Sequence, residues 1–225
     1  MQEDVISIKP KNLIIGIFLS LLLPLLALYS PIIFKNYKFN YEIIFYISRV
    51  NIWLAVFVLF LFTLKIEKFP FLIWKETPYP ILFIIKSIIK TILQMFLAVY
   101  IIGLLVLIFK LKTESVVLNK ALAVFHNHFF LLFFTCITAG ITEELIFRGY
   151  LLPRLEILLK NTKLAIILSS LFFGLLHYSY GTLINVLGPI AFGFIFAIHY
   201  KKYRNIKILI FCHFLWDFII LLIKS

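Results

Sequence analysis

Seven long apolar runs account for most of this chain, and they constrain its fold more than any other feature. They lie near residues 13–34, 43–64, 81–109, 121–152, 164–178, 183–200 and 206–223. Most of them reach the ~20 residues that a helix needs to cross ~30 Å of hydrocarbon. Lipid admits only helices or closed barrels, and continuous rather than alternating runs favour helices. The sequence therefore predicts an all-α, polytopic membrane bundle of about seven transmembrane helices.

The composition agrees with a membrane protein and excludes several other classes. Hydrophobic residues make up 63% of the 225 residues and charged residues 14%, whereas soluble domains have about 45–50% and about 25%. A water-soluble fold of this length cannot bury so much apolar surface, which excludes a soluble enzyme, a disordered chain and a disulfide scaffold. The formal charge of +12 comes mostly from basic residues in short loops. We attribute it to membrane topology and expect no nucleic-acid partner.

The basic residues are distributed unevenly between the two ends of the predicted helices. With seven spans, fourteen Lys and Arg residues lie on the side of the N-terminus and six on the other side. Cytoplasmic loops are enriched in Lys and Arg, so the chain is predicted to be a multi-pass cell-membrane protein with a cytoplasmic N-terminus. Residues 154–160, on the more basic side, are predicted to form a short interfacial helix.

Six ionisable side chains stand within or at the ends of apolar runs. They are Glu143, Glu144, Arg148, His177, His213 and Asp217. An ionised group at the centre of a membrane helix costs about 2.5–3.5 kcal/mol on insertion scales, so the six would cost on the order of 10 kcal/mol if left unpaired. The economical interpretation is that they meet in one polar pocket inside the bundle.

Helical spacing supports such a pocket. Glu144 and Arg148 are four residues apart and can form an ion pair along one helix face. His213 and Asp217 have the same spacing and project together from the last helix. Glu143 is rotated by about 100° from Glu144 and can point into a cavity.

Carboxylates and imidazoles in one pocket support three interpretations. In the first, a carboxylate takes a proton from water, an imidazole orients that water, and a second histidine stabilises an oxyanion. The same groups can bind Zn²⁺, because histidine nitrogen and carboxylate oxygen are common zinc ligands. In the second, the groups form an ion or proton pathway. In the third, they form a structural network that fixes helix packing.

Three short motifs, in order along successive apolar runs, resemble those of the CPBP intramembrane proteases. This family comprises CAAX prenyl endopeptidases and bacteriocin-processing or bacteriocin-immunity proteins, and it is also called the Abi family. The resemblance covers roughly residues 120–223, which we treat as the core of one integral membrane domain over 1–225, after N-terminal helices over 1–110. The motifs E-E-x-x-x-R, F-x-x-x-H and H-x-x-x-[ND] are matched by residues 143–148 (E-E-L-I-F-R), 173–177 (F-G-L-L-H) and 213–217 (H-F-L-W-D).

The resemblance implies an intramembrane endopeptidase that hydrolyses a peptide bond of a membrane-embedded or lipidated peptide. Carried over by motif, Glu143 is the general base and His177 is its partner on the catalytic water. His213 and Asp217 stabilise the oxyanion or bind a metal. Many members carry Asn at the position of Asp217. A carboxylate there favours cation binding, or must be protonated to donate a hydrogen bond.

The remaining motif positions complete this expected site. Glu144 and Arg148 belong to its polar network, and Phe173 is predicted to contact substrate. The cofactor stays open between a divalent metal such as zinc and none. The alternatives to a protease are a non-catalytic bacteriocin-immunity or binding protein on the same fold, and an ion-coupled transporter.

Two further expectations concern neighbouring basic residues. The first motif ends next to Arg154 on the more basic side, so the active site is predicted within the bilayer near the cytoplasmic side. Arg49 lies inside the second apolar run and is predicted to snorkel to the interface or to pair near Asn51.

Overall fold

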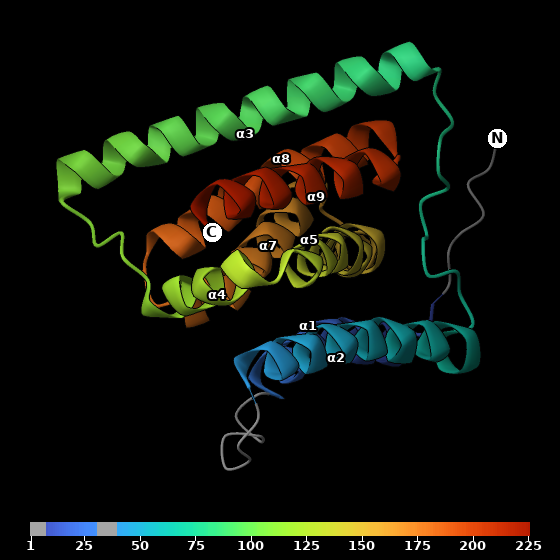
Figure 1. The fold of residues 1–225 in the computed structure, drawn as a ribbon. Helices are drawn as coiled ribbons and strands as arrows, with labels where there is room; N and C mark the ends of the chain where they lie inside the picture. Colours follow the sequence, from blue (N-terminus) through green and yellow to red (C-terminus); the bar gives the residue numbers. More distant parts are fainter. Residues whose placement is uncertain (1–7, 31–39) are drawn as a thin grey trace.

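The computed structural model describes residues 8–30 and 40–225, and this part of the chain is helical without strands (Figure 1). Seven of its segments are long and apolar enough to cross a membrane. The predicted all-α polytopic bundle is therefore confirmed, and the chain is a multi-pass membrane protein. Residues 31–34 of the first run, and Lys35 and Lys38 of the less basic side, lie outside the described residues. The spans are Pro10–Tyr29 (α1), Tyr41–Glu67 (α2, Tyr41–Phe62, with the π-helical turn Thr63–Glu67), Ile81–Phe109 (α3), Phe129–Leu159, Thr162–Tyr180 (α7, Thr162–Leu176, with the 3₁₀ turn His177–Tyr180), Ile184–Tyr203 (α8) and Ile206–Lys224 (α9).

The span Phe129–Leu159 has three parts, and it corrects the predicted run over 121–152. His128 has a non-helical backbone, with φ −136° and ψ 70°, so the run is split there. A separate short helix, α4 (Val116–Asn127), ends before His128, and α5 (Phe129–Glu144) begins after it. A π-helical segment (Leu145–Leu151) and α6 (Leu152–Leu159) continue the span. The short helix predicted over 154–160 corresponds to α6.

The spans form three groups in space (Figure 1). α1 and α2 pack against each other on one side, and α3 lies along α8 and α9 on the opposite side. Between them, α5 packs on α9 and α7 packs on α8, while α2 contacts α5. The three motif-bearing segments lie in or directly after α5, α7 and α9, so this arrangement gathers them in the middle of the bundle.

Capping residues define where several of these helices begin and end. Ser115, Asn161 and Asn205 precede α4, α7 and α9, and each side chain accepts a hydrogen bond from the backbone N–H three residues later. Such caps satisfy N–H groups that the first turn leaves free. The residues that follow α3, α6 and α8 are basic and have positive φ, and they are Lys110, Lys160 and Arg204.

Two glycines allow the motif-bearing helices to approach their neighbours closely. A Cβ at Gly140 of α5 would lie 3.0 Å from both the carbonyl oxygen of Ile210 and the backbone nitrogen of Phe214 in α9. A Cβ at Gly174 of α7 would lie 2.9 Å from the carbonyl oxygen of Val186 in α8. Small residues at helix interfaces permit such backbone contacts in membranes. The sequence thus brings α5 onto α9 and α7 onto α8 at the level of the acidic and histidine residues.

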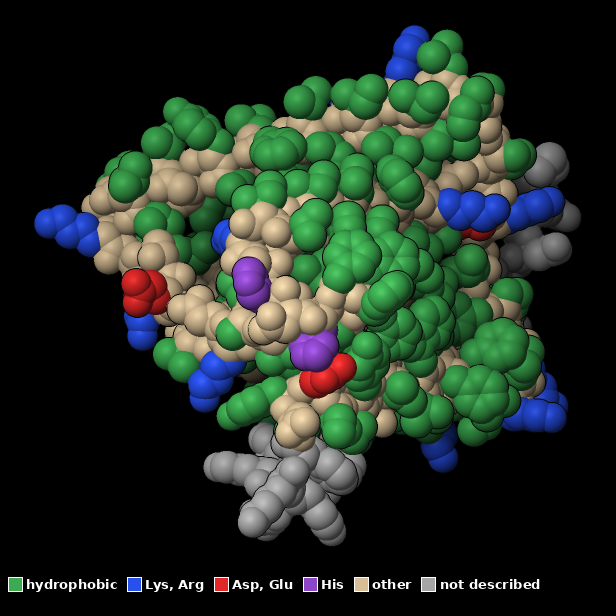
Figure 2. Space-filling view, viewed as in Figure 1, with side chains coloured by type: hydrophobic (Ala, Val, Ile, Leu, Met, Phe, Trp, Pro, Cys, Tyr) green, Lys and Arg blue, Asp and Glu red, His purple; other side chains and the backbone are tan. Residues whose placement is uncertain are grey.

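The outer surface is that expected of a protein surrounded by lipid. Hydrophobic side chains cover most of the face in Figure 2, and Lys and Arg side chains lie mainly around its edges. Large apolar residues are strongly exposed on α3 and α5, including Leu107 at 74% and Phe130 at 81%. In water such surface would drive association, whereas in a bilayer it is solvated by acyl chains.

Candidate active site

A fully buried ion pair lies at the centre of the bundle. Glu144 is the last residue of α5, and Arg148 lies one turn later in the π-helical segment. The Nη1 of Arg148 donates a 2.8 Å hydrogen bond to Oε1 of Glu144, and neither side chain is exposed. The Nδ1 of His213 in α9 donates to the same oxygen, also at 2.8 Å. Glu144 therefore ties the first motif to the third and fixes the orientation of the His213 ring.

The other nitrogen of His213 faces two more carboxylates. Its Nε2 lies 3.4 Å from Oδ2 of Asp217, one turn further along α9, and 3.9 Å from Oε2 of Glu143. The second distance is too long for a direct hydrogen bond and matches a gap that a water molecule or a substrate group can bridge. The Glu143 and Asp217 side chains are 23% and 30% exposed, so both are partly accessible.

His177 approaches this region from a different helix. It begins the 3₁₀ turn after α7, and its Nδ1 donates to the carbonyl oxygen of Phe173 at 3.0 Å. A carbonyl oxygen can only accept, so the neutral ring carries its lone pair on Nε2. That tautomer leaves Nε2 free to accept a hydrogen bond from water.

One cavity contains both Glu143 and His177 in its lining. Its volume is about 60 Å³, which is large enough for water. Glu143 and Thr142 line it from α5, His177 and Tyr180 line it from the end of α7, and Arg49 lines it from α2. A carboxylate and a free imidazole nitrogen that share one water-sized space have the chemistry needed to activate water.

Several buried polar atoms beside this cavity have no hydrogen-bond partner among residues 8–30 and 40–225. They are Oε2 of Glu143, Oε2 of Glu144, and Nε and Nη2 of Arg148. The Arg148 guanidinium lies 4.2 Å from the centre of the Phe173 ring, so an aromatic face covers part of its charge. Buried polar atoms without partners are unusual in structural networks and are found at functional sites.

The described residues do not favour a metal centre here. No group of three His, Cys, Asp or Glu side chains in this part of the chain is arranged to hold a metal ion. We therefore assign no step of the chemistry to a metal.

The structure brings most of the predicted site residues together. Glu143, Glu144, Arg148, His213 and Asp217 form one contiguous cluster, and His177 shares the cavity with Glu143.

Phe173 is buried, at 2% exposure, and packs against the rings of His177 and His213 at centroid distances of 5.2 and 6.0 Å. It is not one of the residues that line the cavity. Its contact with substrate stays a prediction.

The sequence predicts the pocket near the cytoplasmic side, at the end of the bundle that carries Arg154, and its membrane side stays a prediction. The cavity is lined by Ala27 and Leu28 from the last turn of α1 and by Ser48 from the second turn of α2. These helix ends lie opposite to Arg154, which lies in α6 near the far end of its span. Glu143 lies near the middle of the span Phe129–Leu159, so the basic segment that follows the first motif does not indicate toward which end the cavity opens.

Sequence reasoning also missed two arginine environments. Arg49 lines the cavity, whereas Asn51 donates its hydrogen bond to Ser30 instead. Arg154 is completely buried and pairs with Glu67, 87 residues away in the chain. An arginine inside an apolar run was the available signal for Arg49, but no local pattern links Arg154 to Glu67.

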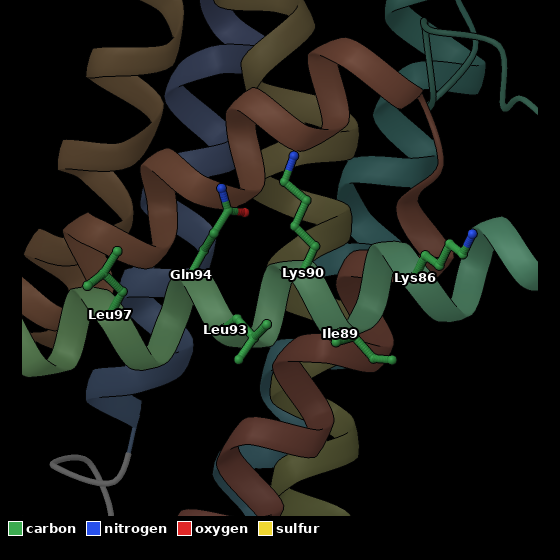
Figure 3. A pocket seen from close by; sticks show the side chains of 6 residues that line it. All are labelled: Lys86, Ile89, Lys90, Leu93, Gln94 and Leu97. Atoms are coloured by element: carbon green, nitrogen blue, oxygen red, sulfur yellow. The ribbon is translucent and has the colours of Figure 1, made fainter.

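A second hollow lies along α3, away from this cluster (Figure 3). It is lined by residues of α3 alone, with Lys86, Lys90 and Gln94 as its polar members. Lys90 and Gln94 extend from the same side of the helix (Figure 3). This hollow is made by one helix and contains none of the motif residues, so the site is assigned to the cavity lined by Glu143 and His177.

The fold and this cluster together define a class of protein. Membrane-spanning helices that enclose carboxylates, imidazoles and a guanidinium form a multi-pass membrane protein with an internal polar site. Residues 125–219 match the family model described as Rce1-like, type II CAAX prenyl endopeptidase Rce1-like. This match confirms the resemblance predicted from the three motifs, and it supports CAAX-type intramembrane protease activity in general. No curated protein and no solved structure matches the chain.

Proposed function

We propose that this protein is an intramembrane endopeptidase in which Glu143 and His177 activate a water molecule for attack on a peptide bond. The observation that carries the proposal is the shared cavity: the Glu143 carboxylate and the His177 ring line one small space inside a bundle of apolar helices. The family match over residues 125–219 supports the same reaction class.

The chemistry follows from the roles that the geometry allows. Glu143 removes a proton from water, and Nε2 of His177 accepts a hydrogen bond that orients the attacking oxygen. The oxygen bonds to the carbonyl carbon of the substrate, and negative charge develops on the carbonyl oxygen. Glu143 then delivers its proton to the amide nitrogen as the C–N bond breaks. One peptide bond and one water are consumed, and one carboxyl group and one amine are formed.

His213 and Asp217 are assigned to the developing oxyanion. When protonated, Nε2 of His213 can donate toward the region between itself and Glu143, while Glu144 holds the opposite nitrogen. A preoriented donor in a site of low dielectric stabilises such an anion strongly. The Oδ2 of Asp217 lies 3.4 Å from the same nitrogen, so this carboxylate stands beside the proposed donor.

The proposed substrate is a peptide that enters from the membrane, either embedded or lipidated. The helices around the cavity are apolar on their outer faces, so a substrate with an apolar segment can reach the site without leaving lipid. A polar peptide from solution would have to cross that apolar surface.

The test of this function is direct hydrolysis by purified protein in liposomes. The probe is a library of quenched fluorescent octapeptides, each with an N-terminal acyl chain, assayed in H₂¹⁸O. Hydrolysis should increase fluorescence and place one ¹⁸O atom in the new carboxyl group, as read by mass spectrometry. Cleavage without ¹⁸O, or no cleavage of any member together with proton-driven flux in the same liposomes, would refute the protease and favour the transporter.

The distribution of charge leads to a proposal about membrane orientation. The more basic ends of the spans, with fourteen Lys and Arg against six, are assigned to the cytoplasm together with the N-terminus. The cavity lies toward the opposite ends, where α1 and α7 finish and α2 begins. The site is then closer to the outer face, and its substrate would be cleaved from that side.

Cysteine labelling in whole cells checks this orientation. Cys136 and Cys212 are buried, so added cysteines dominate the reaction with a maleimide that cannot cross membranes. We expect Leu183→Cys, at an exposed position beside the start of α8, to react in intact cells. Lys163→Cys, in the first turn of α7, should react only after permeabilisation. The reverse pattern would place the N-terminus outside and the cavity toward the cytoplasm.

A further inference from the structure

The cavity contains one cation that the proposed reaction does not use. Arg49 lies in α2, which is outside the segment 125–219 that matches the protease family. Its side chain lines the same cavity as Glu143 and His177. The α1–α2 pair therefore contributes a guanidinium to the wall of the proposed active site.

Arg49 has no acidic partner within the described part of the chain. Its only hydrogen bond there runs from Nε to the hydroxyl of Ser48 at 3.3 Å, and no carboxylate lies within salt-bridge distance. The nearest acid on its own helix, Glu42, lies 3.4 Å from Nδ1 of His128. Residues 31–39, which precede α2, contain no Asp or Glu.

An arginine in this position needs an explanation. A charged side chain inside a membrane span costs several kcal/mol unless it is paired or faces a polar cavity, and such residues mark ligand pathways. The guanidinium is planar and presents two parallel N–H donors, which match the two oxygens of a carboxylate. Glu143 is the acidic residue of the cavity wall, but it lies closest to His213 rather than to Arg49.

We propose that Arg49 is a specificity-determining residue that binds a carboxylate of the substrate beside the scissile bond. This inference rests on the proposed protease function, because it concerns the same cavity. The carboxylate has two possible sources: the C-terminus of the peptide, or the side chain of an acidic residue near the cleaved bond. The small volume of the cavity, about 60 Å³, requires that either group lie only a few atoms from the bond that is cleaved.

The experiment compares three versions of the acylated octapeptide library in liposomes. The first ends in a free carboxylate, the second ends in a carboxamide, and the third ends in a carboxamide with Glu fixed at the last residue. The proteins are the wild type, Arg49→Gln, Arg49→Lys and the control Arg204→Gln, whose arginine is exposed at the far end of α8.

We expect Arg49→Gln to lower kcat/KM by about 10- to 100-fold on the carboxylate library that the wild type prefers, mainly through KM. The variant should cleave the plain carboxamide library at the wild-type rate. Arg49→Lys should recover part of the loss, because lysine restores the positive charge but not the two parallel N–H donors of the guanidinium. Arg204→Gln should behave as wild type. Preference for the first library would identify the C-terminus as the ligand, and preference for the third would identify a side chain.

Equal losses on all three libraries, or no loss on any, would overturn the role of Arg49. A binding measurement keeps this result separate from the protease proposal. In a Glu143→Gln background, a fluorescent free-acid peptide should bind more tightly than its carboxamide, and Arg49→Gln should remove the difference. If the wild type cleaves nothing, the protease proposal fails while this comparison still decides whether Arg49 binds a carboxylate.

Discussion

Replacing Glu143 by glutamine is expected to lower kcat for peptide hydrolysis by about 10²- to 10⁴-fold, the usual contribution of a general base. Glutamine has the same shape as glutamate but cannot take a proton from water. The Glu143 side chain is 23% exposed, and its Oε2 accepts no hydrogen bond among the described residues. The nearest charged partner of this carboxylate among the described residues is Nε2 of His213, 3.9 Å from Oε2, so removing the charge of Glu143 disrupts no close ion pair. The measurement is kcat on the acylated octapeptide library, together with the thermal unfolding midpoint in detergent.

Two matched variants make this result specific. Glu114→Gln changes an exposed glutamate in the connection before α4 and should leave kcat unchanged. Glu144→Gln changes the neighbouring acid, which accepts hydrogen bonds from both Arg148 and His213, and should lower stability as well as activity.

If Glu143→Gln cleaved peptides at the wild-type rate, Glu143 would not be the base. If the variant were inactive as a peptidase yet still complemented the cellular phenotype, a non-catalytic immunity or binding function would be favoured.

The features that depend on hydrophobicity could be predicted from the sequence. The spans follow from runs of about 20 apolar residues, since a bilayer requires helices of that length. The meeting of Glu144, Arg148 and His213 follows from the free energy of placing charge in lipid, which leaves few alternatives to mutual pairing. The motif spacing then fixed which residues of α5 and α9 would face each other.

Features that depend on backbone detail or on distant partners could not be predicted. The break at His128 involves no proline or glycine; its signal is the polar stretch His126–His128, which a single apolar run over 121–152 passes over. The π-helical segment, Leu145–Leu151, changes the register of the first motif without a distinctive residue pattern. The position of the cavity along the bundle depends on the distance of Glu143 from each end of its span. The apolar run over 121–152 includes part of α4, which lies outside the span Phe129–Leu159, so the run gives a wrong distance from Glu143 to the end of the span.

The pairing of Arg154 with Glu67 is the clearest example of a distant contact. The sequence predicts Arg154 in a short interfacial helix on the more basic side. In the structure both side chains are completely buried. The Nε and Nη2 of Arg154 donate to the two carboxylate oxygens of Glu67 at 2.9 and 2.5 Å. Its remaining donors reach the carbonyl oxygens of Phe71, Tyr150 and Pro70 at 3.0 to 3.2 Å.

The hydrogen bonds of Arg154 connect three parts of the protein. Arg154 lies in α6, Glu67 ends the second span, and Pro70 and Phe71 belong to the connection to α3. The ring of Tyr150 lies 3.6 Å from the guanidinium carbon. Because every donor is satisfied, removing one partner leaves a buried charge without compensation.

We therefore expect Glu67→Ala to destabilise the protein by about 3–5 kcal/mol, the range observed when one partner of a buried ion pair is removed. The measurement is reversible unfolding in mixed detergent micelles. The matched control is Lys201→Gln, because Lys201 pairs with Glu156 at 2.6 Å but is 31% exposed. That change should cost at most about 1 kcal/mol. The double variant Glu67→Leu/Arg154→Met, which removes both charges, should recover most of the loss. Equal effects of Glu67→Ala and Lys201→Gln would show that the Arg154–Glu67 pair does not hold α6 to the end of the second span.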